Sequence, residues 1–183
     1  PYTTLFRSKK YANAQQLFES VMPFVKGTPR YEELYLQGWD VIREKRFEKM
    51  KKLGLVDQRY KLSERPEVIP AWENATEKKV WARKMAVYAA MIDRMDQNIG
   101  RLINKLKSNG QYENTMIVFI SDNGACAETV NTKLLSDPEK KIGERGSYHI
   151  YGESWANASN TPFKKYKHYM HEGGVVTPCI IQW

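Results

Sequence analysis

The chain contains little cysteine and histidine and no long run of apolar residues. Its 183 residues include two cysteines, Cys126 and Cys179, and three histidines. Two cysteines define neither a disulfide framework nor a cysteine-based zinc site. No stretch approaches the ~20 consecutive apolar residues that a transmembrane helix requires. The sequence therefore predicts no membrane segment.

An initiator methionine and a signal-peptide pattern are also missing. Residues 1–8 are typical of translated cloning or adapter sequence, so we expect a non-native leader there and exclude it from fold prediction. The last residues, 179–183, have the composition of a buried strand. We expect residues 9–183 to be an internal fragment of a longer reading frame.

Charge of one sign predominates, with a net charge of +8 and an isoelectric point near 9.4. Many of the cations lie in residues 43–52, where glutamates interrupt them. Trp39, Ile42 and Phe47 supply an apolar side, which predicts a helix over residues 40–53 with a solvated basic face. No nucleic-acid-binding motif accompanies the charge, so we expect no nucleic-acid partner. A basic surface is also compatible with a sulfated glycan.

A long amphipathic helix is the clearest predicted element. Eight apolar residues recur at alternating steps of four and three, which predicts a helix from about 77 to 108, ended by Asn109-Gly110. These residues are Trp81, Met85, Tyr88, Ile92, Met95, Ile99, Leu102 and Leu106. We expect the stripe to pack on a sheet. An irregular stretch is expected before the helix, at residues 57–71.

A buried strand is predicted directly after this helix. The apolar run 116–120 has no polar alternation, which is typical of a strand covered on both faces in an α/β protein. It ends in Asp122-Asn123-Gly124, and ligands of such sheets bind beyond the carboxyl ends of the strands. The two side-chain oxygens suit Ca²⁺ or Mg²⁺ better than zinc. Taken alone, the same residues equally suit an ordinary turn.

The stretch from residue 126 to 160 is polar and lacks periodicity, which predicts a long loop at the mouth of the site. Two glycosylation sequons begin at Asn74 and Asn157. Short motifs of this kind occur by chance. We therefore expect both asparagines to be ordinary surface residues.

A second segment, residues 160–178, is basic and aromatic and is closed by a glycine pair and a Thr-Pro. It contains Thr161-Pro162-Phe163, Lys167, Glu172-Gly173-Gly174 and Thr177-Pro178. Together with the helix at 85–96 and the strand that ends in Asp-Asn-Gly, it resembles the type I sulfatases, specifically the arylsulfatase group. The resemblance runs from about residue 35 to 183 and is strongest over 38–183.

This resemblance implies an alkaline-phosphatase-like α/β fold, here an incomplete, mostly parallel sheet flanked by helices, with residues 9–183 as part of the catalytic domain. It implies that Asp122 and Asn123 complete a divalent-metal site, usually Ca²⁺ with Mg²⁺ possible, together with two upstream aspartates. Lys167 matches the catalytic and substrate-binding lysine that holds a sulfate oxygen. A compact ammonium charge suits a tetrahedral oxyanion.

The neighbours of Lys167 receive other roles. Lys164 and Lys165 are expected to be exposed. In the family the leaving-group acid and its partner histidine come from upstream, so His168 and His171 are assigned to local packing. Glu172 is expected to support the Gly-Gly turn.

No nucleophile is identified in this chain. The family uses formylglycine, made from the Cys or Ser of a Cys/Ser-x-Pro-x-Arg motif, and we expect it in a missing N-terminal part. Cys126 lacks the Pro and Arg and is expected to be a small, partly buried residue. Residues 136–140, Ser-Asp-Pro-Glu-Lys, end in Lys and are assigned to a loop.

The resemblance implies an arylsulfatase-like sulfuric ester hydrolase that acts on a small-molecule or glycan sulfate ester, with the fragment alone inactive. Two alternatives remain open: a phosphodiesterase or phosphonate hydrolase of the same superfamily, and a non-catalytic sulfated-glycan-binding fragment. Most relatives are exported or lysosomal, and the resemblance suggests one of these compartments.

Overall fold

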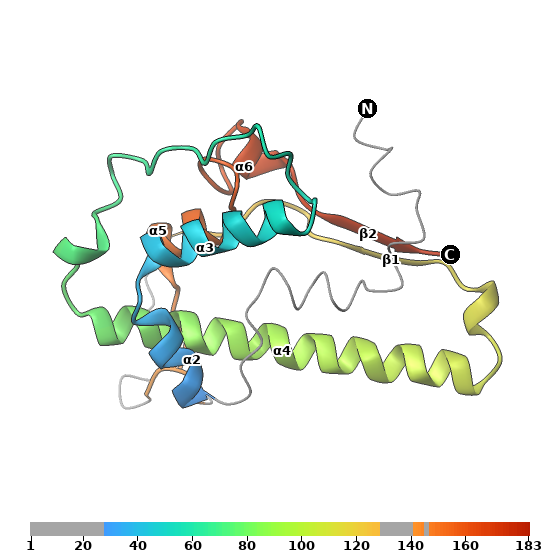
Figure 1. Ribbon diagram of the computed structural model, residues 1–183. Helices are drawn as coiled ribbons and strands as arrows, with labels where there is room; N and C mark the ends of the chain where they lie inside the picture. The colour runs from blue at the N-terminus through green and yellow to red at the C-terminus, as the bar shows by residue number, and fades with distance from the viewer. Residues whose placement is uncertain (1–27, 129–140, 145–146) are drawn as a thin grey trace.

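The computed structural model describes residues 28–128, 141–144 and 147–183 (Figure 1). The predicted leader, residues 1–8, and the loop at 136–140 lie outside the described residues. The elements in chain order are α2 (Thr28–Tyr35), α3 (Trp39–Lys52), η3 (Trp72–Asn74), α4 (Lys78–Ser108), η4 (Tyr112–Asn114), β1 (Ile117–Ile120), α5 (Gly152–Ser159), α6 (Glu172–Val175) and β2 (Cys179–Gln182).

The described strands form one antiparallel pair, β1 with β2, in which Ile117 lies opposite Gln182 and Ile120 opposite Cys179. Both strands lie where the sequence predicts them, but a mostly parallel sheet is not seen in this part of the chain. The prediction that β1 is covered on both faces is also wrong, since Val118 and Ile120 are 50% and 58% exposed. A strand is buried on both faces only where other elements pack on both faces of its sheet. The main contacts of β1 are instead with its neighbour in the sheet, β2.

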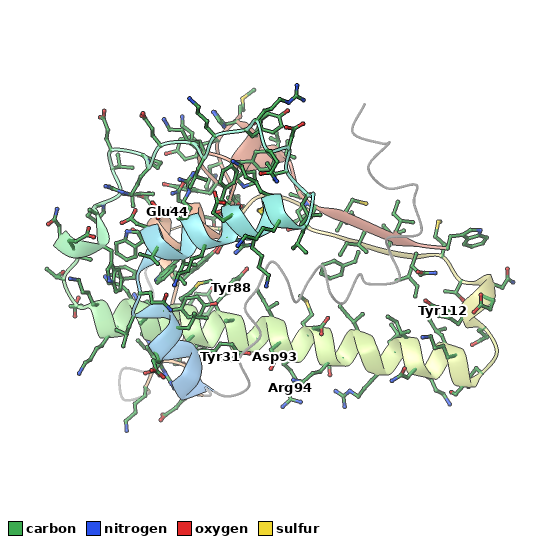
Figure 2. The ribbon with its side chains drawn as sticks, viewed as in Figure 1. Tyr31, Glu44, Tyr88, Asp93, Arg94 and Tyr112 are labelled. Carbon is green, nitrogen blue, oxygen red and sulfur yellow. The ribbon has the colours of Figure 1, made fainter. Side chains whose placement is uncertain are left out.

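Helix α4 begins one residue after its predicted start and ends at the predicted residue. Its N-terminal half enters the core, where Met85 and three alanines are buried. That half packs mainly against α2 rather than on a sheet, which corrects the expected packing. Figure 2 shows Tyr31 of α2 and Tyr88 of α4 in the crowded region where α2, α3 and α4 meet, whereas Arg94 lies on the outer side of α4. Further along, Leu102 is 61% exposed.

Tryptophans from four parts of the chain form the centre of the core. The ring of Trp39 meets those of Trp72 and Trp155 edge-on, with centroids 4.7 and 5.7 Å apart. Trp155 is fully buried, and its indole N–H donates to the carbonyl of Trp81 over 3.0 Å. Trp155 lies in α5, a helix inside the stretch 126–160 that the sequence predicted to be a loop. The packing of α5 on α3, rather than a strong local pattern, accounts for this helix.

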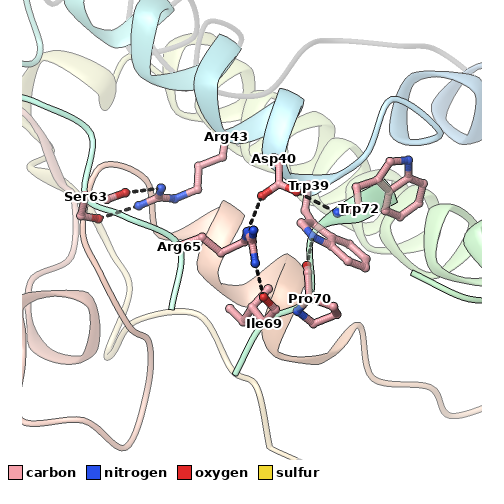
Figure 3. A network of polar contacts seen from close by, with 8 residues as sticks. All are labelled: Trp39, Asp40, Arg43, Ser63, Arg65, Ile69, Pro70 and Trp72. Atoms are coloured by element: carbon pink, nitrogen blue, oxygen red, sulfur yellow. Dashed lines mark hydrogen bonds and ion pairs between the residues drawn. The ribbon is translucent and has the colours of Figure 1, made fainter. Parts of the chain in front are cut away.

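Helix α3, predicted to within one residue, organises a polar network with the irregular stretch 57–71 (Figure 3). The carboxylate of Asp40 pairs with the Arg65 guanidinium at 3.0 Å and accepts the backbone N–H of Trp72 at 2.9 Å. The Trp39 indole donates to the carbonyl of Pro70 over 3.0 Å. These bonds fix an extended segment that has little regular structure of its own.

Arg43 corrects the prediction of a fully solvated basic face on α3. It is 5% exposed, and its guanidinium donates to the carbonyl and hydroxyl of Ser63 over 2.5 and 2.6 Å. Burial lowers the pKa of Arg43 from its ordinary value. The Ser63 hydroxyl in turn donates to the carbonyl of Pro162 over 3.3 Å. The network of α3 therefore reaches the basic, aromatic segment that carries Lys167.

The two sequons differ in the structure. Asn74 is exposed, as expected, but Asn157 is 2% exposed within α5, so the surface prediction for Asn157 is wrong. Among the described helices, none combines the length and apolar character needed to cross a membrane.

Candidate functional site

Asp122 and Asn123 lie immediately beyond the carboxyl end of β1, as the sequence predicts. Two hydroxyls fix this turn: Ser121 donates to the carbonyl of Asn123 over 2.9 Å, and Thr177 donates to the carbonyl of Ser121 over 2.8 Å. The bond from Thr177 joins the chain just before β2 to the chain just after β1. The Asp122 side chain is exposed and that of Asn123 is half-buried, so both can reach a ligand.

Asn160 joins three segments of the site through one side chain. Its amide oxygen accepts the backbone N–H of Ala125 at 2.8 Å. Its amide nitrogen donates to the carbonyl of Lys165 over 2.9 Å and also to the carbonyl of Gly173. The Asp-Asn-Gly turn, the lysine segment and the Gly-Gly turn are therefore held together by Asn160.

Glycines allow these segments to approach closely. The N–H of Gly124 donates to the carbonyl of Gly174 over 3.0 Å. A Cβ on Gly124 would collide with the carbonyl of Gly173, and a Cβ on Gly174 would collide with that of Tyr169. Glycine is therefore required at these two positions because the neighbouring backbone is close, and not because of a left-handed conformation.

Lys167 is anchored at both its backbone and its ammonium. Its N–H donates to the carbonyl of Ala125 over 3.1 Å, and its Nζ lies 2.6 Å from Oε1 of Glu128. The hydrogen bond with Glu128 raises the pKa of Lys167, and the negative charge of Asp122 adds a smaller contribution. In the same way, the hydrogen bond from Lys167 lowers the pKa of Glu128. Lys167 and the turn that carries Asp122 therefore lie close together in the structure, although they are distant in sequence.

The histidines differ from the prediction of local packing. The side chain of His168 is 65% exposed, and its Nε2 lies 2.8 Å from the same Glu128 oxygen that Lys167 contacts. His171 is exposed and precedes α6, and its carbonyl accepts the N–H of Gly174 at 2.7 Å. His168 is thus a polar partner of Glu128, and His171 contributes through its backbone.

Other neighbours also differ from prediction. Lys164 and Lys165 are half-buried rather than exposed, and the Lys165 ammonium lies 4.6 Å from the centroid of the Tyr169 ring. Cys126 is exposed rather than partly buried. Glu172 is the first residue of α6, and its carbonyl accepts the N–H of Val176 at 2.8 Å. Its support of the Gly-Gly turn comes from the backbone.

The donor atoms at the end of β1 are of the type that the predicted metal prefers. The Asp122 carboxylate and the Asn123 amide offer hard oxygens, which suit Ca²⁺ or Mg²⁺. In the part of the chain that the structure describes, no three His, Cys, Asp or Glu side chains group as a metal site would require. A cation held here would therefore need further ligands.

Glu128 and Asn160 are the two residues that sequence reasoning gave no role. Glu128 lies two residues after Cys126, outside every motif that the sequence offers. Asn160 is the first residue of the segment that contains Lys167. A carboxylate six residues beyond Asp122 is a weak signal by itself. Both residues contact segments that are distant from them in sequence, so their contacts form only when the chain folds.

Lys167 and the strand-end residues Asp122 and Asn123 thus lie on segments that hydrogen bonds join. In a comparison with known proteins, the Sulfatase family model matches residues 26–183. An uncharacterised sulfatase of Schizosaccharomyces pombe is 34% identical over 175 residues, covering 84% of this chain and 30% of that protein. An arylsulfatase of Klebsiella aerogenes is 34% identical over 163 residues, covering 83% of this chain and 35% of that protein.

The chain belongs to the sulfatase family. A mouse steryl-sulfatase is a more distant relative, 29% identical over 96 residues that cover 52% of this chain and 12% of that protein. The family implies an alkaline-phosphatase-like α/β fold. The chain spans about a third of the length of the fission-yeast and Klebsiella relatives.

Proposed function

We propose that this chain forms the sulfate-binding part of an arylsulfatase-like enzyme that hydrolyses sulfate esters. One observation carries the proposal: backbone hydrogen bonds tie the segment of Lys167 to the chain just beyond Asp122 and Asn123. The Lys167 N–H donates to the carbonyl of Ala125, and the Gly124 N–H donates to that of Gly174. Membership of the sulfatase family agrees with it.

In the proposed reaction Lys167 binds a non-bridging oxygen of the sulfate group. An ammonium is a compact charge that can approach a tetrahedral anion from any side. Charge that develops on the sulfate and leaving oxygens is stabilised most by cations already in position, because they need no reorganisation during the reaction. The two-point anchoring of Lys167 supports such a role.

Asp122 and Asn123 are proposed to hold Ca²⁺, or Mg²⁺, together with ligands from elsewhere in the protein. When bound, the cation would stabilise negative charge on the sulfate oxygens as a Lewis acid. Hydrogen bonds from the Ser121 and Thr177 hydroxyls hold the backbone of the turn that carries both residues. We propose a formylglycine from upstream sequence as the nucleophile, because no Cys/Ser-x-Pro-x-Arg motif occurs in these 183 residues.

The test uses the protein expressed from the complete reading frame that contains these residues, assayed with a chromogenic aryl sulfate. Lys167→Ala should lower kcat by about 10²–10³-fold, the loss typical of one preorganised oxyanion donor. Lys164→Ala is the matched control and should have a small effect. Equal, small effects of the two substitutions would mean that Lys167 does not bind the reacting sulfate.

An aryl phosphodiester serves as the competing substrate. The proposed function predicts higher kcat/KM for the sulfate ester than for the phosphodiester. The reverse order would favour phosphoryl chemistry on the same fold and would contradict the proposal.

A further inference from the structure

One carboxylate contacts both Lys167 and His168. Oε1 of Glu128 lies 2.6 Å from Nζ of Lys167 and 2.8 Å from Nε2 of His168. Side chains of consecutive residues point to opposite sides in extended backbone. His168 instead has a φ of 82°, in the left-handed region, and both side chains reach the same oxygen. The local backbone therefore gathers two donors at Glu128.

Glu128 takes up hydrogen-bonding capacity of the Lys167 ammonium that a sulfate oxygen would otherwise use. An ammonium has three donors but one unit of charge, so a carboxylate and a sulfate group compete for that charge. The two side chains of the pair are 35% and 32% exposed. Water therefore reaches the pair, and the Glu128 side chain can move away without leaving a buried, unpaired charge.

We propose that Glu128 is a positioning residue that holds the ammonium of Lys167 and competes with the sulfate group for it. The inference rests on the proposed function, because it takes Lys167 as the sulfate-binding lysine. Glu128 keeps the Lys167 ammonium oriented until sulfate binds. It also weakens the binding of inorganic sulfate, so the product dissociates more readily.

The experiment measures binding of inorganic sulfate by calorimetry, in the protein from the complete reading frame. Glu128→Gln should tighten sulfate binding by about two- to fivefold, the range expected when a solvent-exposed ion pair no longer competes. KM for an aryl sulfate should fall by a similar factor, because ester and product sulfate compete with the same carboxylate. Glu113→Gln, an exposed residue of η4, is the control and should change neither value.

A double substitution separates this role from a general effect on the fold. In the Lys167→Ala background, Glu128→Gln should leave the Kd for sulfate nearly unchanged, because the contested ammonium is gone. If the glutamine variant folds poorly, Glu128→Ala gives the same readout. Melting temperatures recorded alongside identify a loss of folding.

The outcomes distinguish a failure of the proposed function from a failure of the role of Glu128 alone. If Lys167→Ala leaves sulfate binding unchanged, the proposed function fails, and this inference fails with it. If Lys167→Ala weakens sulfate binding but Glu128→Gln leaves it unchanged or weakens it, only the role of Glu128 is overturned. Tighter binding in the single variant that disappears in the double variant supports the inference.

Discussion

Asn160 illustrates how single side chains hold the candidate site together. It forms one hydrogen bond to the chain after β1 and two to the chain around Lys167 and the Gly-Gly turn. Removing the amide would leave partly buried backbone groups of Ala125, Lys165 and Gly173 without these partners. The cost of an unsatisfied group usually exceeds the net gain from forming the bond.

We expect Asn160→Ala to lower the free energy of unfolding by about 1–3 kcal/mol. Urea denaturation followed by circular dichroism measures the change. The control is Asn104→Ala on the exposed side of α4, which should stay within about 0.5 kcal/mol of the parent. Equal effects at the two positions would mean that the Asn160 bonds do not support the site.

Asp122 carries the metal proposal. Asp122→Ala should remove most of the affinity for Ca²⁺ in the protein from the complete reading frame, because a hard-cation site loses an anionic ligand. Asn123→Ala should weaken activity more than stability. Calorimetric titration with Ca²⁺ measures the affinity, with Asp57→Ala, an exposed partner of Arg59, as the control. Unchanged affinity in the Asp122 variant would refute its assignment as a ligand.

At the scale of elements, sequence patterns located helices better than they located packing partners. Residues 77–108 were predicted from an apolar stripe, and α4 covers Lys78–Ser108. The stripe did not reveal that α2 would cover its N-terminal half, since α2 is short and lies in a stretch without a clear pattern. A period specifies which face of a helix is apolar, and the fold specifies what covers that face.

The glycines of two elements offer a matched comparison. Gly174→Ala in α6 places a Cβ against the carbonyl of Tyr169, so we expect a loss of more than about 1 kcal/mol in the free energy of unfolding. Gly100→Ala in α4 meets open space and should stabilise by about 0.5–1 kcal/mol, because glycine is a poor helix former. Thermal and urea unfolding compare the two variants. A loss at Gly100 equal to that at Gly174 would contradict the packing argument.

For the whole molecule, a buried tyrosine links stability to high pH. Tyr35 is 1% exposed, and its ring meets Trp155 edge-on at 5.4 Å. Burial raises the pKa of Tyr35 to about 12 from an ordinary value of 10.0. Because the unfolded chain loses this proton at lower pH than the folded chain, Tyr35 stabilises the fold fully below pH ~10, and this contribution is lost as the pH rises through about 12.

We expect the parent protein to lose about 2–3 kcal/mol more stability than Tyr35→Phe between pH 10 and pH 12, since one pKa unit corresponds to about 1.4 kcal/mol. Denaturation at a series of pH values gives this difference. Tyr60→Phe, at a 61% exposed position, should behave like the parent. If the Tyr35 variant and the parent showed the same pH dependence of stability, the pKa of Tyr35 would not be raised in the folded protein.

The sequence by itself determined which segments form α3, α4 and the two strands, and it marked Asp122, Asn123 and Lys167 as the residues to examine. Apolar periodicity and turn residues are local properties, so they can be read along the chain. Only the tertiary structure decided that β1 pairs antiparallel with β2, that Asn157 is buried, and that Glu128 holds Lys167. Each of these depends on groups that are distant in sequence and become neighbours only when the chain folds.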